Sequence, residues 1–329
     1  MDQKRSFEAL RSSRHPMMEA SPHLLYREKT DRIMQLVVLA LMPSIFASIV
    51  FFGIRSLLLY VIAVGTCLLA EFLWFKLRKH TLPKDYSAVV TGMLLAMSLP
   101  ASVPLWYPAL GGVIGIVIAK EVFGGIGRNL LNPALTGRAV LRLIFVTEMS
   151  ANVQPRPFFS TGGLDVVSSA TPLMEAKAGE SLSSGQMLDS LTGLIAGKNA
   201  ETTAILLLLG GIFLLYKKVI TWHIPLCMIG TIVVVSFFFG KGDPTIVFAN
   251  VFGGATMLGA FFMATDYSTS PTTPKGEIIY GICCGLLLVA WRQFSSMPEG
   301  MTFILLIMNC FVPLIDHLII PRAYGVEKQ

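Results

Sequence analysis

The sequence is short of charged residues for a protein of its length. Only 14% of its 329 residues are Asp, Glu, Lys or Arg, and 53% are hydrophobic. A soluble domain carries about 25% charged residues, so this chain lacks the charge needed to cover a water-exposed surface. Several nearly uncharged runs reach the roughly 18 residues that cross a bilayer as a helix. The composition therefore predicts an all-α polytopic membrane protein.

The usual sequence marks of a metal centre or a nucleophilic active site are also missing. The chain has five cysteines, none of them in a CxxC pair or near a histidine at metal-ligand spacing. No Walker loop, zinc-binding helix or nucleophile elbow occurs. We expect most of the cysteines to be buried, no metal site and no catalytic residue, with a cluster shared with another subunit as the alternative for a cysteine.

Positive charge is concentrated before the first apolar run. Residues 1–31 have no pattern of a cleaved signal peptide and read as a cytoplasmic segment. Its basic residues are Lys4, Arg5, Arg11, Arg14, Arg27 and Lys29, with Arg32 following directly. Nucleic-acid or lipid binding is the alternative to a topology signal, but aromatic residues are not interleaved with these charges. We therefore expect a cytoplasmic N-terminus and no nucleic-acid partner.

Ten apolar runs follow, five on each side of a polar segment at residues 148–201. They cover about 33–52, 57–75, 87–99, 107–123, 134–146, 202–216, 219–240, 246–264, 278–291 and 301–320. Five crossings from the cytoplasm place residues 148–201 outside, and the net negative charge of that segment agrees. Ten crossings place both termini in the cytoplasm, including the tail at 322–329.

Five spans per half predict two inverted repeats, at residues 32–147 and 202–321. The third element of each repeat is interrupted by proline-containing segments, Pro100 to Pro104 in the first and Thr265 to Pro274 in the second. Interrupted segments at matching positions of the two repeats indicate a binding site near the midplane of the membrane.

The polar breaks at 124–133 and 265–274 supply candidate site residues. Asn129, Asn132, Asp266, Thr269 and Ser270 could line an ion path or hold a flavin ring. The alternative is that both breaks are only tight loops docked against each other. Asp266 favours a functional role for these breaks, because placing an acidic group within the membrane costs free energy and such groups usually have a function.

Three further charged residues, Glu71, Lys120 and Glu121, fall within spans or at their ends. We expect Lys120 and Glu121 to pair or to reach toward the interface, with ion pumping as the alternative.

The polar segment contains the stretch from Asp165 to Leu173. Taken alone, Thr171-Pro172 has the form of a helix N-cap followed by a first helical proline, with a short helix over residues 173–178. The stretch also resembles the recognition motif of a transferase that moves FMN from FAD to a threonine hydroxyl. In that motif Asp165 is the acidic residue, Ser168 the small hydroxyl residue, and Ser169 and Ala170 the small neighbours of the acceptor Thr171. The two interpretations are compatible.

The resemblance covers nearly the whole chain, roughly residues 25–322. Residues 123–134, with the pattern Asn129-x-x-Asn132-Pro133-Ala134, and residues 263–276 are similar to two signatures of one family. It comprises the D subunit of the Rnf ion-translocating ferredoxin:NAD oxidoreductase and the homologous B subunit of the sodium-pumping NADH:quinone reductase. The short N-terminal segment favours the Rnf member. Ser168 departs from the threonine that many members have.

The resemblance implies a membrane electron carrier that is one subunit of a translocase. FMN on Thr171 would pass electrons between partner membrane and peripheral subunits in a bacterial inner membrane, coupled to sodium or proton transport. It also implies a flavin transferase for maturation and, in some members, a noncovalent riboflavin. A small-solute permease with the same inverted repeat is the alternative, because fold alone does not decide function.

Overall fold

The computed structural model describes residues 30–79, 85–155, 166–167, 172–178, 183–194, 197–199, 203–295 and 299–319, most of them in helices. The first half contains α2 (Thr30–Phe52), α3 (Ile54–Arg78), α4 (Ser87–Met97), α5 (Trp106–Val113), its π-helical continuation η2 (Ile114–Glu121) and α6 (Pro133–Ile144). The second contains α10 (Ala204–Tyr216), α11 (His223–Phe239), α12 (Pro244–Phe252), α13 (Thr256–Leu258), η3 (Gly259–Met263), α14 (Pro274–Phe294) and α15 (Met301–Leu318). Each of the ten predicted apolar runs is thus mostly helical.

Among the described helices, α2, α3, α14 and α15 are long and apolar enough to cross a membrane, and the bent pair α12 with α13–η3 makes a fifth candidate. Helices α4, α10 and α11 are apolar but shorter. Large apolar side chains such as Phe46, Leu143 and Phe238 are mostly exposed, which suits a lipid environment. The all-α membrane class is confirmed, whereas ten spans stay a prediction.

Three helices begin with the same local signal. Asn132, Asp243 and Thr273 are N-caps whose side chains accept backbone N–H bonds, and a proline follows each of them. Proline suits the first helical position because its missing N–H would have no partner within the helix.

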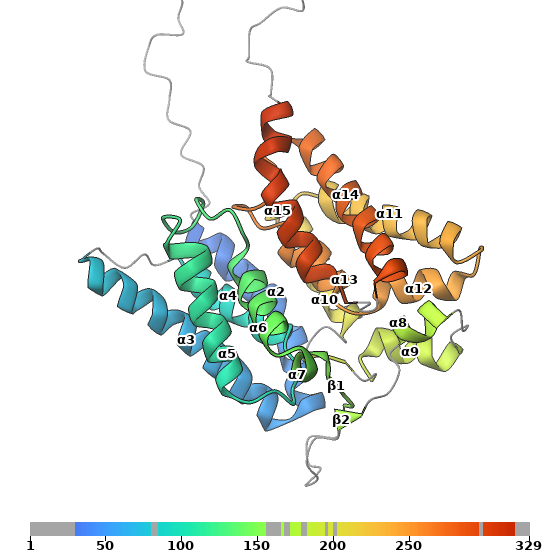
Figure 1. Cartoon of the computed structure of the whole chain (residues 1–329), viewed down its shortest axis with the longest axis horizontal. Coiled ribbons are helices and arrows are strands. Elements are labelled where there is room, and N and C mark those ends of the chain that lie inside the picture. The colour runs from blue at the N-terminus through green and yellow to red at the C-terminus, as the bar shows by residue number, and fades with distance from the viewer. Residues whose placement is uncertain are drawn as a thin grey trace, which may run out of the picture.

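The helices of the two halves lie side by side with corresponding contacts (Figure 1). In the first half α3 packs on α5 and η2, which pack on α6; in the second, α11 packs on α14, which packs on α15. Between the halves α2 packs on α10, and α6 on α15. The first helices of the two halves, α2 and α10, therefore contact each other, and so do the last ones, α6 and α15.

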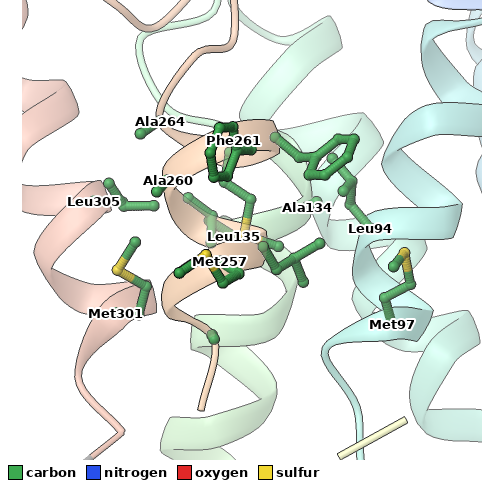
Figure 2. Packing of buried hydrophobic residues seen from close by; sticks show 14 of the residues in the cluster. Leu94, Met97, Ala134, Leu135, Met257, Ala260, Phe261, Ala264, Met301 and Leu305 are labelled. Carbon is green, nitrogen blue, oxygen red and sulfur yellow. The ribbon is translucent and has the colours of Figure 1, made fainter. Parts of the chain in front are cut away.

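The core lies where the halves meet. Figure 2 shows Met257, Ala260 and Phe261 of α13–η3 between two groups of side chains from other helices. One group is Met301 and Leu305 of α15, and the other is Leu94, Met97, Ala134 and Leu135 of α4 and α6. The interrupted third element of the second half is therefore the centre of the packing.

The second half has an interruption that the apolar run 246–264 did not indicate. Helices α12 and α13–η3 meet at a bend of 57°. Gly254 has φ +62° there, a conformation that a glycine adopts without strain. Arg292 of α14 donates to the carbonyl of Gly253 at 3.2 Å and to Thr256 Oγ1 at 2.7 Å. An arginine distant in sequence thus satisfies the backbone that the bend exposes.

The described residues of the polar segment between the halves form short elements. These are α7 (Val146–Ser150), β1 (Asn152–Val153), β2 (Val166–Val167), α8 (Pro172–Ala178) and α9 (Ser184–Thr192). The strands pair antiparallel, a small addition to the predicted all-α class. Helix α8 confirms the short helix expected after Thr171. These elements gather at one end of the bundle, away from the C-terminal end of α15 (Figure 1).

Replacing Gly137 of α6 with leucine should destabilise the protein by about 1–3 kcal/mol through overpacking. A Cβ on Gly137 would lie 2.3 Å from the carbonyl oxygen of Gly111 in α5, so the two helices would have to separate. Thermal unfolding in detergent measures the effect. Gly65→Leu is the matched control, because nothing lies within 4 Å of its Cβ position on the exposed surface of α3. Equal melting temperatures for both variants would contradict the prediction.

Candidate functional site

The two polar breaks predicted from the sequence lie against each other. The Asn132 side chain caps α6 by accepting from the backbone N–H of Ala134 at 3.0 Å and of Leu135 at 3.3 Å. Its Nδ2 donates to Asp266 Oδ2 at 3.3 Å, across a separation of 134 residues. The same Asp266 oxygen accepts from the hydroxyls of Ser268 and Thr269, both at 3.2 Å. Asn132, Asp266 and Thr269 therefore form one hydrogen-bonded group at the junction of the halves.

Asn309 of α15, which the sequence analysis did not identify, connects both breaks. Its side chain is 1% exposed. In the amide orientation that satisfies its neighbours, the oxygen accepts from the Asn132 backbone N–H at 3.2 Å. The nitrogen donates to the Thr269 carbonyl at 3.3 Å and lies 3.0 Å from the Tyr280 hydroxyl. An asparagine within an apolar span was the available signal, since such a residue needs polar partners.

A pocket opens beside this group. Its polar lining comprises Ser87, Thr91, Lys120, Asn129, Asn132, Thr265, Asp266, Tyr267 and Ser268. Its apolar lining includes Val90 and Leu94 of α4, Leu214 of α10, and Phe261 and Phe262 of η3. A largely apolar lining with a few convergent polar groups is typical of small-molecule sites.

Lys120 joins the pocket to a buried ion cluster. Its ammonium group contacts a Glu71 carboxylate oxygen of α3, donates to Ser87 Oγ at 2.6 Å and lies 3.7 Å from Glu121 Oε1. The side chains of Lys120, Glu71 and Glu121 are only 3%, 6% and 3% exposed. Lys120 therefore pairs in the interior, one of the two outcomes expected from the sequence, and does not reach the membrane surface.

The remaining predicted site residues are separate from this group. Asn129 is buried and lines the pocket, with its Nδ2 donating to the Leu131 carbonyl at 3.2 Å. Ser270 lines a neighbouring groove that contains Lys217 and Lys218. Asp165, Ser168, Ser169, Ala170 and Thr171 lie outside the described residues, which resume at Pro172.

Helix α8 fixes where the chain continues after Thr171. Leu173 is 5% exposed and packs at the bend between α12 and α13, close to the Cβ positions of Gly253 and Gly254. Ser183 and Gln186 form a capping box at the start of α9, and Gln186 Nε2 donates to Glu175 of α8 at 2.8 Å. The segment after Thr171 is thus attached to the second half of the bundle.

Replacing Asn309 with leucine should cost about 1–3 kcal/mol, because Asn132 N–H and the Thr269 carbonyl lose a buried partner. The melting temperature in detergent should fall, and Asn309→Asp should recover part of the loss if its carboxyl oxygen still accepts from Asn132. Cys310→Leu, on the exposed neighbouring position, is the control. A melting temperature for Asn309→Leu equal to that of the control would contradict the bridging role.

These features define a multi-pass helical membrane protein with a polar pocket between its halves. The chain belongs to the NQR2, RnfD, RnfE family, whose model matches residues 17–325.

Two relatives in this family match this chain over nearly the full length of both proteins. The chain is 41% identical over 314 residues to the D subunit of the Na(+)-translocating ferredoxin:NAD(+) oxidoreductase complex of Acetobacterium woodii, covering 94% of this chain and 96% of that protein. It is 37% identical over 345 residues to the D subunit of the ion-translocating oxidoreductase complex of Escherichia coli K12, covering 94% and 98%. The family resemblance expected from the three motifs is confirmed.

Proposed function

We propose that this chain is the D subunit of an ion-translocating ferredoxin:NAD oxidoreductase complex and carries electrons between partner subunits. The similarity to the corresponding Acetobacterium woodii protein, over nearly the full length of both chains, is the observation that carries the proposal. The same family assignment argues against a small-solute permease. The chain is one part of a multi-subunit enzyme and acts with the other membrane and peripheral subunits in the inner membrane.

FMN on Thr171 is the proposed redox group, attached by a flavin transferase that recognises Asp165, Ser168, Ser169 and Ala170. When bound, FMN supplies electron transfer in single steps. The protein then has to hold the ring, exclude side reactions and set its potential. The described residues next to the motif fit this task, because α8 is fixed on the bundle through Leu173.

The pocket between the halves is the proposed site of a second, noncovalent flavin, riboflavin. Its apolar lining from η3 and α4 suits a flat aromatic ring, and Asn129, Asp266 and Lys120 supply donors and acceptors for the ring edge. The alternative for the same polar residues is a path for the sodium ion or proton. In both cases Asn132 and Thr269 hold Asp266 in place.

We further propose ten spans in two inverted repeats, residues 32–147 and 202–321, joined by an extracytoplasmic segment at 148–201. The corresponding contacts, α2 with α10 and α6 with α15, support an internal twofold relation. Both termini, residues 1–31 and 322–329, are then cytoplasmic. The position of α8 and α9 at the end of the bundle away from the end of α15 agrees with a flavin segment on the outer side (Figure 1).

Deletion of this chain in its own organism tests the proposed function. Membranes from the deletion strain should lose reduction of NAD by reduced ferredoxin and the associated ion uptake into vesicles, and the intact chain should restore both. An affinity tag on the restored chain should also recover partner subunits. Full activity in deletion membranes, together with a lost small-solute flux, would overturn the proposal in favour of a permease.

A further inference from the structure

A groove beside the pocket between the halves follows the turn that joins α10 to α11. Residues of this turn line it, together with the second polar break and the first turns of α2, α11 and α14. The two lysines of the turn, Lys217 and Lys218, are part of the lining, and so are the apolar side chains of Ile33, Ile220 and Ile224. The groove therefore combines positive charge with an apolar wall.

The turn that carries the lysines is held in one conformation. Lys218 adopts the left-handed conformation (φ +56°) that commonly ends a helix. Its N–H donates to the Leu215 carbonyl at 3.0 Å, and the next N–H, of Val219, donates to the Leu214 carbonyl at 2.9 Å. The hydroxyl of Tyr267, from the second break, donates to the Val219 carbonyl. The lysine side chains thus extend from a fixed backbone.

Neither lysine has an acidic partner in the described part of the chain. The Lys217 ammonium lies 6.0 Å from the centroid of the Phe213 ring and 5.8 Å from that of the Tyr216 ring, so aromatic faces hold it. An aromatic face attracts a cation but carries no net charge. The positive charge of the turn is therefore not neutralised by the described residues.

The one acidic residue among the described lining residues is engaged elsewhere. Glu277 Oε2 accepts from the Thr221 hydroxyl at 2.6 Å and lies 3.0 Å from His223 Nδ1. Both partners lie beside the start of α11, and neither lysine contacts this carboxylate. Two cations and one hydrogen-bonded carboxylate favour a ligand with negative charge.

The surroundings of the groove are those of a membrane surface. Tyr216 and Trp222 flank the turn, Tyr267 lines the groove, and all three side chains are exposed. Tyrosine and tryptophan are typical of the boundary between membrane and water. The turn also joins two apolar helices, α10 and α11. Basic pockets between spans at this level are typical sites for anionic lipid headgroups.

The charge of the N-terminal segment argues against this segment as the occupant. Residues 1–29 lead into α2, whose Ile33 lines the groove. They contain six Lys or Arg and four Asp or Glu, so the segment and the groove have charge of the same sign. An occupant of opposite charge from outside the chain is favoured.

We propose that the groove binds an anionic phospholipid, with its phosphate at Lys217 and Lys218. The apolar wall of Ile33, Ile220 and Ile224 contacts an acyl chain. The orientation proposed above makes this a lipid of the cytoplasmic leaflet. The site itself depends neither on that orientation nor on a flavin.

Native mass spectrometry of the full chain in detergent, titrated with dioleoylphosphatidylglycerol, tests the site. Dioleoylphosphatidylcholine has the same acyl chains and no net charge, and wild type should bind it more weakly. Each lysine near an anionic headgroup contributes about fivefold in affinity, so the double variant Lys217→Gln with Lys218→Gln should bind phosphatidylglycerol roughly 25-fold more weakly. Thr221→Trp retains both lysines but fills the groove, and it should also weaken binding.

Lys241→Gln is the matched control. Lys241 is an exposed lysine directly after the C-cap of α11, has φ +51° like Lys218, and does not line the groove. Its substitution should leave the affinity for phosphatidylglycerol unchanged. All four substituted positions are exposed, so we expect every variant to fold, which far-UV circular dichroism checks.

The outcomes are distinct. Weaker phosphatidylglycerol binding in the double variant and in Thr221→Trp, with wild-type affinity in Lys241→Gln, supports the site. Equal affinity of wild type for the two lipids overturns it, and so does an equal loss in Lys241→Gln. Unchanged affinity in Thr221→Trp would overturn the groove as the binding site. Displacement of the lipid by excess inorganic phosphate would identify a free anion as the occupant, and much tighter binding after deletion of residues 1–20 would identify the N-terminal segment.

Discussion

Replacing Thr171 with valine is expected to remove covalently bound FMN completely. Valine has nearly the shape of threonine but no hydroxyl oxygen, so no phosphoester can form. The measurement is intact-protein mass spectrometry with in-gel flavin fluorescence, on protein co-expressed with an active flavin transferase. Wild type should gain the mass of one FMN less water, and Thr171→Val should lack both the increment and the fluorescence.

Two controls make this result specific. Thr192→Val removes an exposed threonine hydroxyl from α9 and should retain the flavin. Ser169→Ala keeps a small side chain beside the acceptor, which is the property that the motif requires at this position, so we expect this variant to stay labelled. An FMN increment in Thr171→Val would show that another residue is the acceptor, and an unmodified wild type would remove the flavin from the proposed function.

Replacing Lys120 with methionine is expected to destabilise the protein by about 3–5 kcal/mol, the cost of leaving a buried charge without its partner. Glu71 and Glu121 would then lose the only lysine that contacts both in the described part of the chain. The melting temperature in detergent should fall by many degrees. Lys241→Met, which removes an exposed lysine, should have little effect.

A second substitution distinguishes charge from packing at this cluster. Adding Glu71→Gln to Lys120→Met removes the unpaired carboxylate and should recover part of the lost stability. A double variant as unstable as the sum of the two single variants would contradict the ion-pair explanation. The same cluster borders the pocket between the halves, so riboflavin content should be measured for each variant.

Much of the fold could be predicted from the sequence because a bilayer leaves the backbone few choices. Apolar runs must be helical where water is absent, so the runs at 33–52 and 57–75 became α2 and α3. Local caps such as Asn132-Pro133 fixed helix starts, and Pro172 indicated α8. The bend at Gly253 was missed, because its exposed carbonyls are satisfied by Arg292 from a later helix.

The residues of the candidate site could likewise be predicted only in part from the sequence. Asn132, Asp266 and Thr269 could be selected from the sequence because polar residues in interrupted spans are costly without a role. Asn309 and Ser87 could not be assigned to the site, since their importance depends on which helices pack together.

The sequence by itself determined the class of this protein, its apolar runs, its charge distribution and its family motifs, because these depend on residues that are neighbours in the chain. The tertiary structure decided that the two polar breaks share one hydrogen-bonded group and that Lys120 pairs with Glu71 in the interior. These features arise from contacts between residues as many as 134 positions apart, as for Asn132 and Asp266. Packing of helices from both halves brings such residues together, and no local pattern in the sequence encodes that packing.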